Sequence, residues 1–196
     1  MHGRIAIIVA AGTAALLLMH AMSGTDAQES PKSAGDEEAS FIGDAMESVT
    51  SIFSNWPSGS DDYQVMIQNA SNDSGVPVAI LAWLLWKESR YNPAIISGAK
   101  RSSVGAMGIA QFMPATAIDE LGSVDAALNP AQAIPGAANY LAKLYNTAGS
   151  WAGALAAYNW GIGNVQRKGI ANAPAETTDY YTTILSKANA GGENYS

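Results

Sequence analysis

An apolar stretch that ends abruptly in charged residues constrains the fold of this chain more than any other feature. Every residue from 76 to 86 is apolar, and charged residues cluster at positions 87–90. A helix from Val78 to about Ser89 would carry apolar side chains on every face, so other helices must surround it. The hydrophobic content of 48% is high enough to build such a core.

The carboxylate of Glu88 is unusual because it shares one row of this helix with leucines, which lie three, four and seven residues earlier. Apolar surroundings and the partial negative charge at a helix C-terminus both favour the protonated acid. A carboxylic acid that keeps its proton near neutral pH can act as a general acid. The alternative is a helix-end Glu paired with Lys87 or Arg90, and this helix alone leaves both interpretations open.

The rest of the folded part also shows helical signals, and no alternating strand pattern or internal repeat is visible. A last helix is expected at about residues 175–188. The sequence therefore predicts a mainly α domain over residues 61–190. Residues suited to end or cap the other helices are Gly75, Gly122, Asn129 and Ser150.

Composition excludes several kinds of chemistry. The net charge is −7, and no basic stripe offers contacts to the phosphates of a nucleic acid. The chain has no cysteine, which excludes disulfides and thiolate metal sites. The two histidines, His2 and His20, precede the folded part, so a histidine base or metal site is excluded there. We expect chemistry based on carboxylates, hydroxyls, amides or backbone groups, with no metal and no cofactor.

Residues 1–27 have the pattern of an export signal. Arg4 precedes an apolar run over residues 5–19, small residues follow, and cleavage is expected after Ala27. The alternative is an uncleaved membrane anchor, although the run is short for a span of about 20 residues. Either way the folded domain is expected outside the cytoplasm, in the periplasm or cell envelope.

Residues 28–60 are expected to form a flexible linker, because the first part is rich in Ser, Gly, Asp and Glu. Within it, residues 41–56 place apolar side chains at helical spacing. This amphipathic segment is expected to pack on the main domain, and the alternative is that it lies on a membrane or a partner.

Three further segments combine small residues with polar side chains. Ser102 and Gln111 flank a glycine-containing stretch, where backbone and amide groups can approach a sugar closely. Tyr158 and Asn159 end an alanine-rich helix, and Glu176 opens the last helix. The simpler explanations are tight helix crossing, a helix stop with a packed aromatic, and a Glu favoured at a helix N-terminus.

In their order and combination these segments resemble the soluble-type (SLT) lytic transglycosylases of glycoside hydrolase family 23, which are related to goose-type lysozymes. The resemblance covers about residues 62–188 and rests on ESRYNP, SSVGAMGIAQFMPATA, NPAQAIPGAANYLAKL, ALAAYNWGIGNV and APAETTDYY. It implies a lysozyme-like helical domain with a groove for peptidoglycan glycan strands. Glu88 would be the single essential acid. Positions that would line the groove or support the acid are Ser102, Gln111, Tyr158, Asn159 and Glu176.

The resemblance also implies a reaction without water. Glu88 would protonate the glycosidic oxygen between N-acetylmuramic acid and N-acetylglucosamine. It would then take the proton of the sugar's own 6-hydroxyl, which gives a 1,6-anhydromuramoyl product. Two other interpretations stay open. One is a hydrolase that activates water with Asp119, Glu120 or Asp125, and the other is a non-catalytic glycan-binding component of a secretion system or virion.

The chain departs from the family pattern at three places. Ala110 stands where Met usually precedes the Gln, and Trp160 stands where Ala is common. The segment before Gly105 is longer than usual, so Ser97 competes with Ser102 for the role of the family's serine. The spacing to Gly105 favours Ser102.

The sequence leaves the biological setting open. Besides glycan strands, the expected partners are proteins of a secretion or conjugation machine or of a virion, to which the linker and the 41–56 segment could dock. Membrane association through the N-terminus is also expected if that segment is not cleaved.

Overall fold

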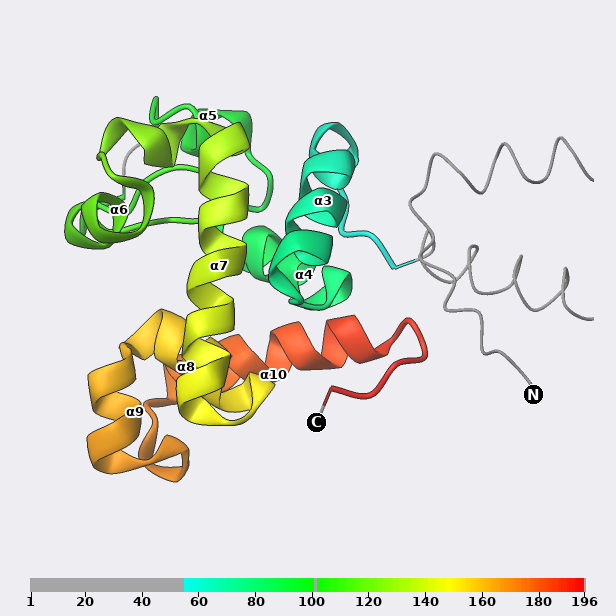
Figure 1. The fold of residues 1–196 in the computed structure, drawn as a ribbon, viewed down its shortest axis with the longest axis vertical. Coiled ribbons are helices and arrows are strands. Elements are labelled where there is room, and N and C mark those ends of the chain that lie inside the picture. The colour runs from blue at the N-terminus through cyan, green and yellow to red at the C-terminus, as the bar shows by residue number, and fades with distance from the viewer. Residues whose placement is uncertain (1–54, 101, 196) are drawn as a thin grey trace, which may run out of the picture. The chain divides into compact units, whose positions relative to one another are not determined.

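The structure is a computed structural model that describes residues 55–100 and 102–195. These residues are mostly helical (Figure 1), and they contain no strand, only an isolated bridge between Met107 and Phe112. The mainly α fold predicted from the sequence is confirmed. The helices are η1 (Asp61–Tyr63), α3 (Gln64–Ser74), α4 (Val78–Ser89), α5 (Pro93–Ile96), α6 (Pro114–Leu121), η2 (Asp125–Leu128), α7 (Pro130–Ala148), α8 (Trp151–Trp160), α9 (Ile162–Lys168), η3 (Ile170–Asn172) and α10 (Ala175–Asn189).

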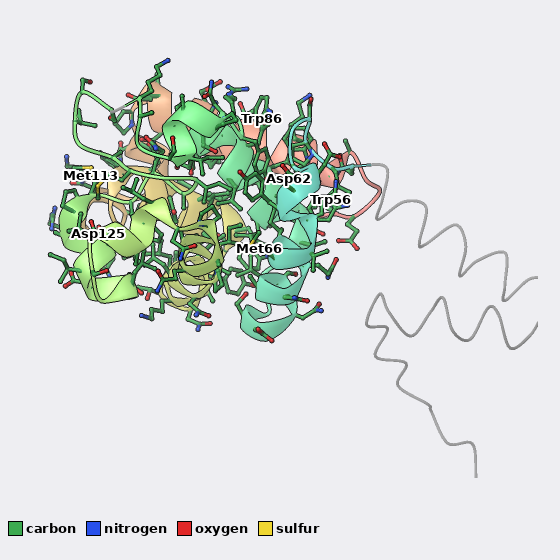
Figure 2. All side chains as sticks on the ribbon, turned by 90° about the horizontal axis from the view of Figure 1, so that it is seen from above. Trp56, Asp62, Met66, Trp86, Met113 and Asp125 are labelled. Atoms are coloured by element: carbon green, nitrogen blue, oxygen red, sulfur yellow. The ribbon has the colours of Figure 1, made fainter. Side chains whose placement is uncertain are left out.

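The apolar helix α4 packs against both α3 and α10, while α7 packs against α3 and α8, and α8 against α10. Side chains fill the spaces between these helices (Figure 2). The leucines of α4 have no exposed surface, whereas Trp83 and Trp86 remain partly exposed. The sequence therefore predicted the burial of most of α4, but tertiary packing leaves one side of the helix open at these two tryptophans.

The predicted helix ends are found at the expected residues. Gly75 and Gly122 adopt left-handed backbone conformations, with φ of 75° and 81°, directly after α3 and α6. The Asn129 side chain accepts a hydrogen bond from the first turn of α7, and Ser150 does the same for α8. The final helix ends one residue beyond the predicted 175–188 range, at Asn189.

Several sequence predictions fall on residues that the structure does not describe. These are the signal or anchor at residues 1–27, the linker as far as residue 54, and the 41–56 helix apart from its last two residues. Within the described segments, no helix has the length and apolar character needed to cross a membrane.

Candidate active site

The end of α4 is fixed by a buried serine next to the candidate acid. Arg90 and Tyr91 both have left-handed backbone conformations, with φ of 54° and 51°, which non-glycine residues rarely adopt. The fully buried hydroxyl of Ser89 donates to the Leu85 carbonyl at 3.0 Å and accepts from the Tyr91 N–H at 3.2 Å. These bonds satisfy backbone groups at the turn, so α4 stops one residue after Glu88.

Glu88 lies half-buried at this helix end and accepts a 2.5 Å hydrogen bond on its Oε1 from the Tyr180 hydroxyl of α10. Burial raises the pKa of Glu88 from 4.5 to about 7, although the Tyr180 hydrogen bond and the nearby Lys87 charge act in the opposite direction. The direction agrees with the expectation drawn from the row of leucines. A carboxyl with this pKa exists in both protonation states near neutral pH, as acid and base catalysis require.

The alternative explanation, an ion pair between Glu88 and a neighbouring cation, is wrong. The Lys87 ammonium lies 2.7 Å from the Asp179 carboxylate of α10. The Arg90 guanidinium stacks on the Trp86 ring, with Cζ 3.4 Å from the ring centre. Both cations next to Glu88 in the sequence are therefore held by other groups.

Tyr158, near the end of α8, lies close to the Glu88 carboxylate. Burial raises the pKa of the Tyr158 phenol well above its usual range, and the charges of Glu88 and Tyr140 add to this effect. Its hydroxyl donates a 2.9 Å hydrogen bond to the Ala110 carbonyl. Tyr158 thus anchors the loop that carries Gln111, and it interacts with the acid electrostatically.

That loop is a tight turn closed by two backbone hydrogen bonds between Met107 and Phe112, each 3.0 Å long. Gln111 has a φ of 49°, and its side-chain Nε2 donates to the Gly108 carbonyl at 2.8 Å. A Cβ on Gly108 would lie only 1.7 Å from the carbonyl oxygen of Ala127. Gly108 is therefore needed for close packing of this loop on η2, which is a loop contact and not the helix crossing considered from the sequence.

Asn159 and the start of α10 are joined by a hydrogen bond that the sequence did not reveal. The Asn159 Oδ1 accepts from the Thr177 hydroxyl at 2.8 Å, and Thr177 is only 2% exposed. Glu176 lies exposed in the first turn of α10, where a negative charge is favourable. Asn159, near the end of α8, thus helps to fix α10, the helix that carries Tyr180.

The predicted site residues fall into two groups. Glu88 and Tyr158 lie together, and Gln111 is connected to them through its neighbour Ala110. The contacts described for Ser102 stay within its own turn, where its hydroxyl accepts from the Val104 N–H at 3.3 Å. Within the described residues, no hydrogen bond or ion pair links Ser102, Asn159 or Glu176 directly to Glu88.

Two residues that contact Glu88 or fix its helix end, Tyr180 and Ser89, were not predicted as site residues. Tyr180 lies in the predicted last helix, and its phenol is the hydrogen-bond donor to the acid. One signal was available: a tyrosine is an amphipathic residue, and its hydroxyl usually finds a partner when the ring is buried.

The three departures from the family pattern have distinct local consequences. Trp160 is the last residue of α8, and the Lys168 ammonium lies over its ring, 5.2 Å from the ring centre. Ala110 is fully buried, and its carbonyl receives the Tyr158 hydroxyl. Ser97 caps the end of the short helix α5, where its N–H bonds to the Pro93 carbonyl.

One of the carboxylates considered for a hydrolase is already paired. Glu120 forms a 2.6 Å ion pair with Lys143 of α7. Asp119 and Asp125 are exposed. No contact described for these three side chains involves Glu88.

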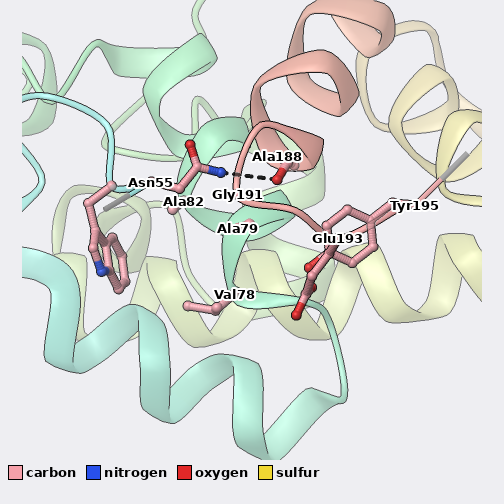
Figure 3. Close-up of a pocket in the computed structure, with 9 residues that line it drawn as sticks. Asn55, Val78, Ala79, Ala82, Ala188, Gly191, Glu193 and Tyr195 are labelled. Carbon is pink, nitrogen blue, oxygen red and sulfur yellow. Dashed lines mark hydrogen bonds between the residues drawn. The ribbon is translucent and has the colours of Figure 1, made fainter. Parts of the chain in front are cut away.

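A small pocket lies elsewhere, between the first half of α4 and the chain after α10 (Figure 3). It has a volume of about 50 Å³, well below the roughly 300 Å³ of typical small-molecule sites. The Asn55 side chain spans its edge with a 3.0 Å hydrogen bond to the Ala188 carbonyl. This pocket does not include Glu88 and is too small for a sugar.

Solved structures of lytic transglycosylases share this fold. One is an inactive Glu-to-Gln mutant of lytic transglycosylase Slt from Pseudomonas aeruginosa, with 24% identity, a TM-score of 0.58, and coverage of 66% of this chain and 24% of that one. Another is the 70-kDa soluble lytic transglycosylase from Escherichia coli, with 23% identity, a TM-score of 0.57, and coverage of 68% and 25%. A third is the 70-kDa soluble lytic transglycosylase in complex with bulgecin A, with 23% identity, a TM-score of 0.58, and coverage of 67% of this chain and 25% of that one.

At these identities the solved structures show the fold alone, and this chain spans about a quarter of their length. The family comparison reaches further. Residues 65–181 match the transglycosylase SLT domain, a segment that is more than half of the chain and contains Glu88, Tyr158 and Tyr180. The chain therefore belongs to the transglycosylase SLT domain family.

Proposed function

We propose that this protein is a peptidoglycan lytic transglycosylase of glycoside hydrolase family 23. It cleaves the β-1,4 bond between N-acetylmuramic acid and N-acetylglucosamine without consuming water, and it releases 1,6-anhydromuramoyl products. The observation that carries the proposal is the state of Glu88: a half-buried carboxyl with a pKa of about 7, hydrogen-bonded to Tyr180 and not ion-paired. Membership of the transglycosylase SLT domain family supports the choice of substrate and reaction.

In the first step the protonated Glu88 gives its proton to the glycosidic oxygen. The bond between that oxygen and the anomeric carbon breaks, and the N-acetylglucosamine portion leaves with a neutral hydroxyl. With a pKa of about 7, about half of the Glu88 carboxyls carry this proton at neutral pH. An ordinary glutamic acid would be protonated in well under about 1% of molecules there, so burial supplies most of the available acid.

In the second step the ionised Glu88 acts as a base. It takes the proton from the 6-hydroxyl of the muramoyl sugar, whose oxygen attacks the anomeric carbon and closes the anhydro ring. The sugar's N-acetyl group stabilises the cationic intermediate. Glu88 regains its proton, so the cycle is balanced without water or metal. The Tyr180 hydroxyl, which donates to Glu88, stabilises the carboxylate between the two steps.

The other site residues are proposed to hold the glycan or its supports. One N–H of the Gln111 amide donates to the Gly108 carbonyl, and the amide oxygen is the group proposed to accept a bond from a sugar. Tyr158 and Asn159 act mainly by fixing the Gln111 loop and the start of α10. Ser102 and Glu176 are proposed to contact the strand farther from the cleaved bond.

Digestion of purified peptidoglycan followed by mass spectrometry of the products tests the reaction. The proposal expects anhydro products, each lighter by one water than the product of a hydrolase. Hydrated products would instead favour a muramidase. Glu88→Gln is expected to keep the fold and glycan binding and to lose cleavage. Cleavage that survives this substitution would refute the mechanism, and wild-type protein that binds but never cleaves would make the protein a glycan-binding component.

We also propose that the domain works outside the cytoplasm, in the periplasm or cell envelope. The support is the export pattern of residues 1–27 together with a substrate that lies outside the cytoplasmic membrane. The mass of the protein recovered from an expressing cell distinguishes cleavage after Ala27 from a retained anchor. Docking of residues 28–60 to a secretion or conjugation machine, or to a virion, remains a further proposal.

A further inference from the structure

Two consecutive contacts join the end of α4 to α10. Lys87 pairs with Asp179, and the next residue of each helix forms the Glu88–Tyr180 hydrogen bond. Both contacts span the same sequence separation of 92 residues. The ion pair therefore lies directly beside the hydrogen bond that holds the acid.

We propose that Lys87 and Asp179 are positioning residues for the acid: their ion pair aligns α4 with α10 so that the Tyr180 hydroxyl meets Glu88, and it holds the Lys87 charge on Asp179. The proposal rests on the assignment of Glu88 as the catalytic acid and deepens it. Neither Lys87 nor Asp179 is placed against the sugar.

The charges around Glu88 show why this arrangement affects the acid. Lys87 is the cation that lowers the pKa of Glu88, and it opposes the larger effect of burial. The Asp179 carboxylate lies 2.7 Å from the Lys87 ammonium, and the hydrogen bond and charge of Lys87 lower the pKa of Asp179. Asp179 therefore acts on Glu88 through Lys87, because it fixes where the Lys87 charge lies.

Other titratable groups near Glu88 are either neutral or held by other side chains. Arg90 is stacked on a tryptophan, and the two phenols that face the carboxyl, Tyr158 and Tyr180, have pKa values raised well above their usual range, so they stay neutral. Helix α3, which also packs on α4, carries one charged residue, Asp73, beside the opposite end of α4.

The ion pair is too exposed to be explained by stability alone. The Asp179 side chain is 70% exposed and that of Lys87 is 17% exposed. Pairs with an exposed partner contribute little to folding because water and salt screen them. Its effect on the neighbouring acid is less screened, since the Glu88 carboxyl is desolvated.

The test measures the titration of Glu88 in the full chain by NMR of its side-chain carboxyl carbon, identified by its absence in Glu88→Gln. Lys87→Gln removes the cation and leaves Asp179 unpaired, so the titration midpoint is expected to rise by about one pH unit. Asp179→Asn removes the anion and frees the Lys87 ammonium, so the midpoint is expected to fall by about half a pH unit. The double variant removes both charges, so its midpoint is expected to lie between those of the two single variants.

The matched control is Lys143→Gln, which breaks the ion pair with Glu120, the second of the two described in this structure. It is expected to leave the Glu88 midpoint unchanged. A merely structural role for Lys87 and Asp179 predicts loss of stability in both single variants and no opposite shifts. If both single variants shift the midpoint in the same direction, or neither exceeds the control, the proposal is overturned.

Kinetics on peptidoglycan fragments provide a second readout. Both single variants are expected to lower kcat about 3- to 10-fold with little change in KM, because the acid is misaligned while the sugar contacts remain. A change confined to KM would mean that these residues bind substrate, which contradicts the proposal. The NMR titration does not depend on activity, so active Glu88→Gln protein would refute the proposed mechanism and leave the ion-pair result to be judged separately.

Discussion

A desolvated catalytic acid should cost the folded protein stability, and the size of this cost follows from the structure. Replacing Glu88 by Gln keeps the size of the side chain and leaves an amide oxygen that accepts the Tyr180 hydrogen bond. The substitution removes the ionisation and replaces the second carboxyl oxygen by an amide NH2 of similar size. We therefore expect Glu88→Gln to be more stable than wild type above pH 7, although it is inactive.

The sign follows from the two pKa values. The pKa of Glu88 is about 7 in the folded protein, against an ordinary value of 4.5 that applies to the unfolded chain. Below the lower value both states hold the proton, and the two proteins should be equally stable. As the pH rises through this window, the unfolded chain releases its proton first, so wild type loses stability until the folded carboxyl has also ionised.

The magnitude follows from the same values. At about 1.4 kcal/mol per pKa unit, the full loss is about 3 kcal/mol. For a domain of this size it corresponds to roughly 10 °C in melting temperature. This is a large fraction of the stability of a typical domain, so the effect should be easy to measure.

Urea unfolding of the full chain near pH 4, 6 and 8 measures the difference. The variants are Glu88→Gln and, as the matched control, Glu176→Gln, which removes an exposed carboxyl from α10. The gain for Glu88→Gln should be near zero at the lowest pH and reach about 3 kcal/mol at the highest, whereas the control should not stabilise the protein at about pH 8. A gain that is absent at the highest pH, or equal at all three, would refute the reasoning.

Three other substitutions test particular contacts. Tyr180→Phe removes the donor that favours the ionised acid, so peptidoglycan cleavage should fall roughly 10- to 100-fold, and the pH limb that reports Glu88 should move to higher pH. Gly108→Ala should destabilise the protein by about 3 kcal/mol in urea unfolding, because the new methyl meets a backbone carbonyl. Gly105→Ala is its control, since it has a similar positive φ but open space, and should cost only about 1 kcal/mol. Ser89→Ala should cost about 1 to 2 kcal/mol, because it removes the hydroxyl that accepts from the buried Tyr91 N–H, and a smaller loss in thermal unfolding would show that water replaces the hydroxyl.

Most helix boundaries could be predicted because the signals that end helices are local. Gly75 and Gly122 end their helices through a left-handed conformation that glycine adopts without strain, and Ser150 caps the helix that follows it. The short helices α5 and α9 were missed. Helix α5 begins at Pro93 and α9 follows Gly161, and both residues also suit turns.

The acid of the site could be predicted from the sequence, but the residues that contact the acid and its neighbour could not. The raised pKa of Glu88 comes from burial, and its direction agrees with the row of leucines that helical geometry places beside this residue. The partner of Lys87 is not local, because Asp179 lies 92 residues away and meets it only through the packing of α10 on α4. Sequence spacing offered Glu88 itself as a nearer candidate, and that alternative was wrong.

The sequence by itself thus determined a mainly helical fold and most helix ends, because these depend on short-range geometry, and it indicated an acid at Glu88 without excluding an ion pair there. Only the tertiary structure decided that Tyr180 donates to this carboxylate, that Tyr158 holds the neighbouring loop, and that Lys87 is paired with Asp179. These contacts join helices far apart in the chain. Their partners depend on the angle and register at which the helices pack, and no pattern within a single segment encodes either quantity.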